Sequence, residues 1–319
     1  MGWRQWLIGL IVVAAFAGIV LHIGQLQNFA QLVRQLQPAW LAAAVLLQLS
    51  TYASLALSWR EVLRKGDGRS PPLKGLIRIA LSKLFADQAL PTAGMGGNVL
   101  LVDQLAAAGA SRGSAVAVLL ISIRGYYAAY LVLALASLFL LWLHGEATPL
   151  MVGLVTTFML VALAIPALAL WLHRRGSRPL PPAIERARPI AQLLDTMGQA
   201  PAGLIGDRGL LFKVAMFNGA VFLADTLTLY AGARGLGVDL SVSTALIAFV
   251  LASIVVTLRP IPFGLGTFEA TCTGVLHLLG VPIEAAFSAV LLLRVLALWL
   301  PLLPGAVQMR KAGRPRRST

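Results

Sequence analysis

Long runs of hydrophobic residues, separated by short polar segments, make up most of this chain of 319 residues. A helix that crosses a bilayer needs about 20 predominantly apolar residues. Four stretches meet that length: 6–24, 39–59, 149–172 and 210–233. Two more contain an inner arginine, Arg124 within 113–143 and Arg294 within 283–309. The pattern predicts an all-α integral membrane protein with about six full transmembrane helices, because helices pair their backbone N–H and C=O groups internally.

Two further apolar regions are broken near their middle by proline and glycine. The first, 77–108, is divided within Leu90–Gly97, and the second, 242–279, is divided within Arg259–Gly266. Proline and glycine disfavour a continuous helix, so each region is expected to form a re-entrant hairpin of two short helices. Such breaks are tolerated at membrane depth where they line a cavity or are buried in protein.

The same order of elements occurs twice in what we expect to be a single membrane domain, 1–319. Each of the halves 1–148 and 149–319 has two spans, a broken hairpin and then a span with an inner arginine. The elements of the first half are expected to start on the inner side of the membrane and those of the second half on the outer side. This opposite orientation predicts an inverted-topology repeat. A basic, proline-rich cytoplasmic linker is expected over 173–209.

Composition and charge agree with a membrane location. Hydrophobic residues make up 58% of the chain and charged residues 12%, against roughly 25% charged in ordinary soluble domains. The net charge is +14, and 21 of the 26 Lys and Arg residues lie at the same ends of the spans. The positive-inside rule therefore predicts a multi-pass protein of the cell membrane with both termini cytoplasmic. The scattered basic groups favour contact with anionic lipid and argue against nucleic-acid binding.

Arg124 and Arg294 occupy matching places in the two halves. Gly94 precedes Arg124 by 30 residues, and Gly264 precedes Arg294 by 30 residues. An arginine in mid-membrane costs about 2.5–3.5 kcal/mol, so it should face a partner or a watery cavity. It either joins helices through an ion pair or binds an anion, since the guanidinium grips phosphate with paired hydrogen bonds. We favour the anion site. The acids that could act as ion-pair partners are Asp87, Asp103, Asp225 and Glu269.

The helix that follows each glycine break would present free N–H groups and partial positive charge to an anionic substrate. Thr267 is a candidate N-cap for the second of these helices, and Glu269 suits its positive start. The alternative is a tight turn whose glycines serve helix packing. With Arg124 and Arg294, the predicted substrate-binding residues are Gly94, Gly96, Gly97, Asn98, Gly264, Gly266, Thr267 and Glu269. The candidate proton carriers or ion-pair partners are Asp87, Asp103 and Asp225.

The histidines and the single cysteine show no metal-ligand spacing, and no nucleotide-binding loop is present. We therefore expect no metal and no cofactor.

The segment 258–270 reads Leu-Arg-Pro-Ile-Pro-Phe-Gly-Leu-Gly-Thr-Phe-Glu-Ala. It resembles the Pro-Gly-Gly-x-Gly-x-x-Glu-[Ala] signature of the transmembrane region of lysylphosphatidylglycerol synthases and of related stand-alone flippase-like proteins. The continuation through Gly280-Val281-Pro282, Leu293-Arg294 and 299–305 is also similar, and Leu90-Pro91 resembles the family's first motif. The resemblance implies a flippase-like transporter that moves an anionic or phosphate-bearing lipid, a membrane phospholipid or a lipid-linked substrate, between leaflets.

The sequence departs from that family pattern in two places. Thr92–Asn98 is uncharged where the family's first motif usually carries arginine and glutamate, and Ile123 precedes Arg124 where an acid is common. Because the chain ends soon after its last span, we expect no soluble aminoacyl-transferase domain, and a transporter is favoured over an enzyme. The alternatives are an integral-membrane enzyme or accessory subunit of a lipid or glycan pathway, and a small-solute carrier. An oligomer is compatible with each.

Overall fold

The computed structural model describes residues 36–89, 95–143, 145, 148–175, 200–258 and 266–299, and these residues contain helices and no strand. The all-α membrane fold predicted from the sequence is confirmed. The helices are α3 (Pro38–Asp67), α4 (Leu73–Ala89), α5 (Met95–Ala107), α6 (Arg112–Leu143), α7 (Pro149–Arg175), α10 (Ala202–Ile205), α11 (Arg208–Gly235), α12 (Val242–Leu258), α13 (Thr267–Leu278) and α14 (Ile283–Arg294), which continues as a π-helical turn, η2 (Val295–Trp299).

Among the described residues, four helices are long and apolar enough to cross a membrane: α3, α6, α11 and the Met151–Leu168 part of α7. The helix α12 is apolar but shorter. Large apolar side chains such as Leu46 and Trp142 are exposed on the outside of the bundle, as a surface that faces lipid requires. The predicted span 6–24 and the end of the last span, 300–309, lie outside the described residues, so the number of six spans stays a prediction.

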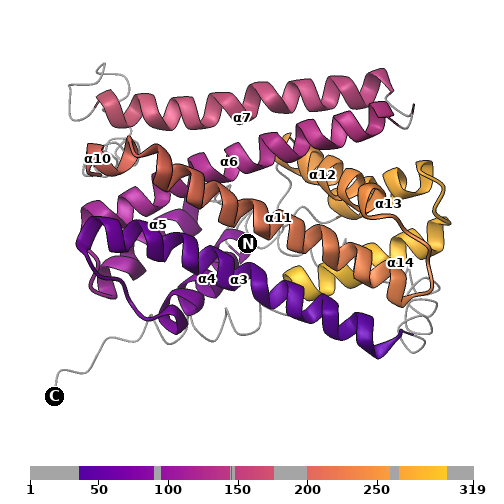
Figure 1. Cartoon of the computed structure of the whole chain (residues 1–319), viewed down its shortest axis with the longest axis horizontal. Coiled ribbons are helices and arrows are strands. Elements are labelled where there is room, and N and C mark those ends of the chain that lie inside the picture. The colour runs from indigo at the N-terminus through magenta and orange to yellow at the C-terminus, as the bar shows by residue number, and fades with distance from the viewer. Residues whose placement is uncertain are drawn as a thin grey trace, which may run out of the picture.

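The helices α3 and α11 form an antiparallel pair and lie side by side over their length (Figure 1). At one end, the backbone N–H of Gln37 donates to the carbonyl of Gly235 at 3.1 Å. At the other end, Lys213 Nζ donates to Glu61 Oε2 at 3.2 Å. Each helix of this pair belongs to a different predicted half, so the pair joins the two halves.

The helices of the two predicted halves keep one register. The helices α3, α4, α5 and α6 start at 38, 73, 95 and 112, and α11, α12, α13 and α14 start at 208, 242, 267 and 283. Corresponding starts are therefore 169–172 residues apart. Within each set the two short helices pack against each other, α4 on α5 and α12 on α13. The division into two related halves stays a prediction.

The breaks themselves, 90–94 and 259–265, lie outside the described residues, and so do Gly94 and Gly264. Most of the predicted linker, 176–199, also lies outside them. The described end of that linker forms α10, which packs against α6 and α3.

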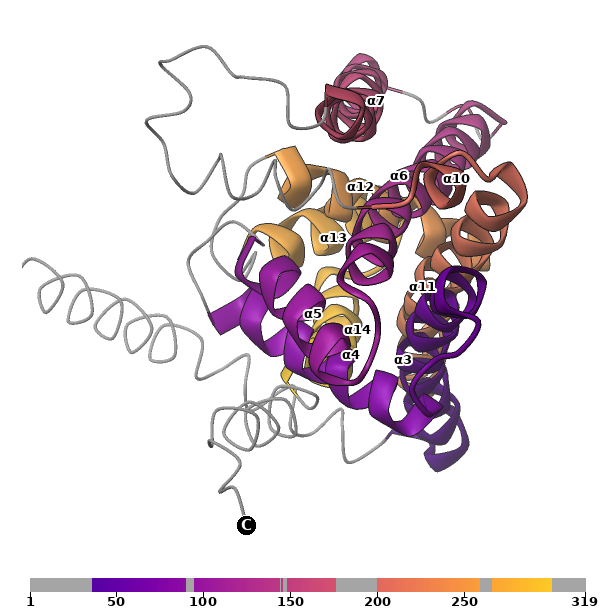
Figure 2. The same ribbon diagram turned by 90° about the vertical axis from the view of Figure 1, so that its left-hand side faces the viewer.

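The buried apolar side chains gather in two main clusters. One joins α3, α4, α5, α10, the first part of α6 and the start of α11, with Trp59 and Leu120 among its buried members. The other joins the later part of α6 with α7, α11, α12, α13 and α14, around Tyr130 and Phe158. Figure 2 shows α7 on the outside of the bundle, next to α6 and α12. The helices α6 and α11 thus belong to both clusters and tie them together.

Candidate functional site

Three predicted site residues meet at the start of α13. Gly266 precedes the helix with a φ of +81°, a conformation that favours glycine. Its backbone N–H donates to Glu269 Oε2 at 2.8 Å, and Arg294 Nε donates to Glu269 Oε1 at 2.7 Å. The Glu269 carboxylate therefore links the start of α13 to the last residue of α14. Thr267, expected as the N-cap, is instead the first helical residue, and Gly266 holds the cap position.

The Glu269–Arg294 ion pair is largely shielded from solvent. The side chains are 12% and 15% exposed, respectively. The guanidinium carbon of Arg294 also lies 5.1 Å from the centre of the Phe268 ring, a distance at which a cation is attracted to an aromatic face. A carboxylate, a guanidinium and a helix start are thus held together at the edge of the second glycine break. Of the four acids considered for the arginines, the structure selects Glu269 for Arg294.

The first half places its predicted residues differently. Asp87 Oδ2 accepts from Lys83 Nζ on the same helix at 2.6 Å. A Cβ atom at Gly97 would lie 1.9 Å from Asp87 Oδ1, so glycine at this position leaves room for the Asp87 carboxylate beside the start of α5. Asn98 is half-buried and Asp103 is exposed. Gly96 lies in the first turn of α5. Asp87 therefore forms its ion pair with a lysine.

Arg124 ties α6 to the described end of the linker. Its Nη1 donates to the backbone carbonyl of Ile205 at the end of α10. The next residue, Gly125, lets α6 approach α11 closely, because a Cβ atom there would lie 2.7 Å from Val214 Cγ1. Arg124 and Arg294 thus contact different kinds of partner, a backbone carbonyl and a carboxylate, and both partners belong to the second predicted half.

Asp225 lies in the middle of α11 and receives a hydrogen bond that the sequence did not predict. Gln48 Nε2 on α3 donates to Asp225 Oδ1 at 2.8 Å and lies 3.1 Å from Thr228 Oγ1. Gln48 is buried. The sequence shows Gln48 as a polar amide within an apolar span. It does not show that the partner of this amide is Asp225, 177 residues away.

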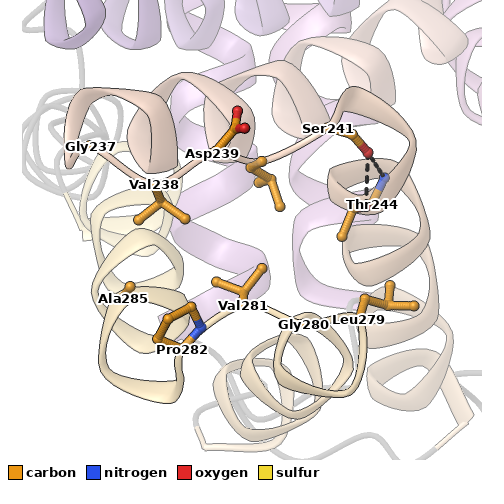
Figure 3. A pocket seen from close by; sticks show the side chains of 11 residues that line it. Gly237, Val238, Asp239, Ser241, Thr244, Leu279, Gly280, Val281, Pro282 and Ala285 are labelled. Atoms are coloured by element: carbon orange, nitrogen blue, oxygen red, sulfur yellow. Dashed lines mark hydrogen bonds between the residues drawn. The ribbon is translucent and has the colours of Figure 1, made fainter.

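In the part of the chain that the structure describes, two pockets lie at opposite ends of the α3–α11 pair. One, of about 370 Å³, lies between the 237–244 and 279–285 loops, where Ser241 Oγ accepts from the Thr244 backbone N–H at 3.0 Å (Figure 3). The other, of about 420 Å³, is lined by Glu61, Arg64, Lys65, Gly209, Leu210 and Lys213. Neither pocket is lined by Arg124 or Arg294. Among the described residues, no group of three or more His, Cys, Asp or Glu side chains could hold a metal ion.

The chain matches the family model described as the lysylphosphatidylglycerol synthase TM region over residues 6–305. The chain belongs to this family. The match runs through both glycine breaks and both inner arginines, so the lysylphosphatidylglycerol synthase TM region includes every candidate site residue named above. A UPF0104 membrane protein of Methanothermobacter thermautotrophicus is 31% identical over 99 residues, which cover 31% of this chain and 29% of that protein.

Proposed function

We propose that this chain moves an anionic or phosphate-bearing lipid between the leaflets of the cell membrane. The observation that carries the proposal is the shielded Arg294 guanidinium beside the start of α13. Guanidinium groups bind phosphate oxygens with paired hydrogen bonds, and helix starts attract anions. In a membrane protein of this family, a lipid headgroup is the anion that both features fit.

Glu269 would regulate the binding of that headgroup. Its carboxylate already satisfies the Gly266 N–H and the Arg294 Nε. A headgroup phosphate would compete for the same two donors, so binding the lipid would loosen the contact between α13 and α14. The acyl chains would stay in the surrounding lipid. In this proposal Arg124 serves the corresponding step in the first half.

The two halves would alternate as an inverted repeat. The helix starts keep an offset of 169–172 residues, and the neighbouring helices α3 and α11 are antiparallel. Transporters built from inverted repeats expose a central site to each side in turn by moving one unit against the other. Re-entrant hairpins at α4–α5 and α12–α13, and cytoplasmic termini, are part of the same proposal.

Reconstitution of the purified protein in vesicles with labelled phospholipid tests the proposal. The variants are Arg294→Lys and Arg124→Lys, because a lysine keeps the charge but loses the paired geometry. Arg234→Lys is the matched control, since Arg234 pairs with the exposed Asp239 in a loop-side contact. We expect the first two variants to lose lipid movement while their melting temperatures stay close to that of the original protein.

Three results would count against the proposal. Unchanged lipid movement in both variants would exclude the substrate role of the arginines. Activity lost only in proportion to lost folded protein would assign the arginines to helix packing. Turnover of a labelled headgroup by the original protein would instead indicate a membrane enzyme.

A further inference from the structure

Asp225 is a carboxyl group in the middle of a membrane-spanning helix. At 1.5 Å per residue, it lies about 18 Å along α11 from Lys213 and about 13 Å from Arg234. Both neighbouring turns of α11 are apolar apart from hydroxyl groups. An ionisable group at such depth is expensive, and it generally marks an ion or proton pathway.

The carboxyl group is held by neutral groups. Gln48 Nε2 donates to Asp225 Oδ1, and Thr228 Oγ1 near the same amide donates to the carbonyl of Ala224 at 2.8 Å. Within the described ranges Asp225 forms no ion pair with a lysine, arginine or histidine. Ionisable residues within membrane helices generally pair with one another or with backbone carbonyls, whereas Asp225 accepts from a side-chain amide.

The surroundings of Asp225 contain few ionisable groups. Tyr52 on α3 and Tyr126 on α6 are close enough to interact with it electrostatically. The helix α12 carries no ionisable side chain, and Arg294 of α14 is paired with Glu269. The ionisable groups in the inner parts of the helices packed against α11 are therefore Tyr52 of α3, Arg124, Tyr126, Tyr127 and Tyr130 of α6, and Arg294 of α14.

The first half has no counterpart of this acid. In the register of the two halves, Leu55 corresponds to Asp225 and Gln48 corresponds to Asn218. Asn218 is buried and donates to the carbonyl of Val214 on its own helix at 2.8 Å. The amides are therefore present in both halves, whereas the carboxyl group is present in one. Its position on the α3–α11 contact places it where the two halves meet.

We propose that Asp225 is a proton-binding site of the transport cycle, at which the carboxyl group takes up one proton from one side of the membrane and releases it to the other. The proposal rests on the lipid transport proposed above and supplies its source of energy. A carboxylate can only accept hydrogen bonds, whereas a protonated carboxyl group also donates one. The Gln48 amide has both a donor and an acceptor, so it can pair with either form by turning its amide group.

Protonation would thereby change the contact between the halves. With the carboxylate, Gln48 Nε2 donates across the α3–α11 interface, as the structure has it. With the protonated acid, the amide turns so that the carboxyl O–H donates in the opposite direction, to Gln48 Oε1. One proton enters and one leaves in each cycle, and no other bond is made or broken.

Infrared spectroscopy of the reconstituted full chain tests the proton site independently of transport. We expect a band of a protonated carboxyl group that appears on acidification, is lost in Asp225→Asn and is retained in Asp239→Asn, whose carboxyl group is a surface one. In Gln48→Met the carboxylate loses a hydrogen bond, so the same band should appear at higher pH, by up to about one unit. A spectrum without a band that depends on Asp225, or a midpoint that Gln48→Met leaves in place, would overturn the proposal.

Transport then tests the coupling. The probe is fluorescent phosphatidylglycerol in vesicles of phosphatidylethanolamine and phosphatidylglycerol, with a pH gradient of one unit across the membrane. Such a gradient shifts the steady-state distribution of the lipid by up to about tenfold for each proton carried. We expect this shift in the original protein and its loss in Asp225→Asn.

The outcomes separate this inference from the proposed function. Lipid movement in the original protein that ignores the gradient would refute proton coupling and leave the proposed function intact. A gradient response that Asp225→Asn retains would also refute it. An Asp225 band that titrates in a protein that moves no lipid would refute the proposed function and the coupling, while the proton site itself would stand.

Discussion

The Glu269–Arg294 ion pair allows the strongest prediction about stability. Replacing Glu269 by Ala leaves the Arg294 guanidinium, 15% exposed, without the carboxylate that accepts from its Nε. Removing one partner of a buried pair costs about 3–5 kcal/mol, because the remaining charge is left uncompensated. The same substitution removes the acceptor for the Gly266 N–H, so we expect a loss at the upper end of that range.

A double-mutant cycle with Glu269→Ala and Arg294→Leu measures the interaction itself. Because removing both partners leaves no uncompensated charge, the double variant should lose less stability than the two single variants together. We expect a coupling free energy of about 1–3 kcal/mol, measured as unfolding in a graded detergent mixture. The control cycle uses Arg234 and Asp239, whose side chains are 35% and 97% exposed, and should give at most about 1 kcal/mol. If the losses of stability in Glu269→Ala and Arg294→Leu add up in the double variant, the two side chains do not stabilise each other and the prediction is wrong.

Three further predictions follow from other parts of the molecule. Gly125→Ala brings a Cβ atom within 2.7 Å of Val214 Cγ1 and should destabilise the protein by about 1–3 kcal/mol. The control Gly153→Ala meets no atom within 4 Å and should not destabilise it. Equal melting temperatures of the two variants would contradict the close approach of α6 to α11. A cysteine at position 318 in a Cys272→Ser background should react with membrane-impermeant reagents only from the cytoplasmic side, and labelling from outside would reverse the proposed orientation. The hydrogen bond from Lys65 lowers the pKa of Asp207. The ionised Asp207 therefore stabilises the fold above the unfolded-state pKa, and this stabilisation is lost as the pH falls through the folded-state pKa. Asp207→Asn should make stability depend less on pH on the acid side, and an unchanged pH dependence would exclude this contribution of Asp207.

The sequence by itself determined the length and position of the described spans. Hydrophobic length and the helix-breaking effect of proline and glycine act over neighbouring residues, so 39–59 became part of α3, 113–143 became α6, and the region 242–279 became two helices. The starts of α3–α6 and of α11–α14 are 169–172 residues apart, close to the offset of 170 between Arg124 and Arg294. These features depend on local composition and need no knowledge of tertiary contacts.

Tertiary structure alone decided which side chains meet. The sequence offered four acids for two arginines, and the fold pairs Arg294 with Glu269, turns Arg124 toward the carbonyl of Ile205, and leaves Asp225 to Gln48. Each of these partners comes from another helix, between 25 and 177 residues away. Such contacts depend on how each helix is rotated about its axis and on how two helices cross. Hydrophobic length constrains neither, and so the partners of the charged groups could not be read from the sequence.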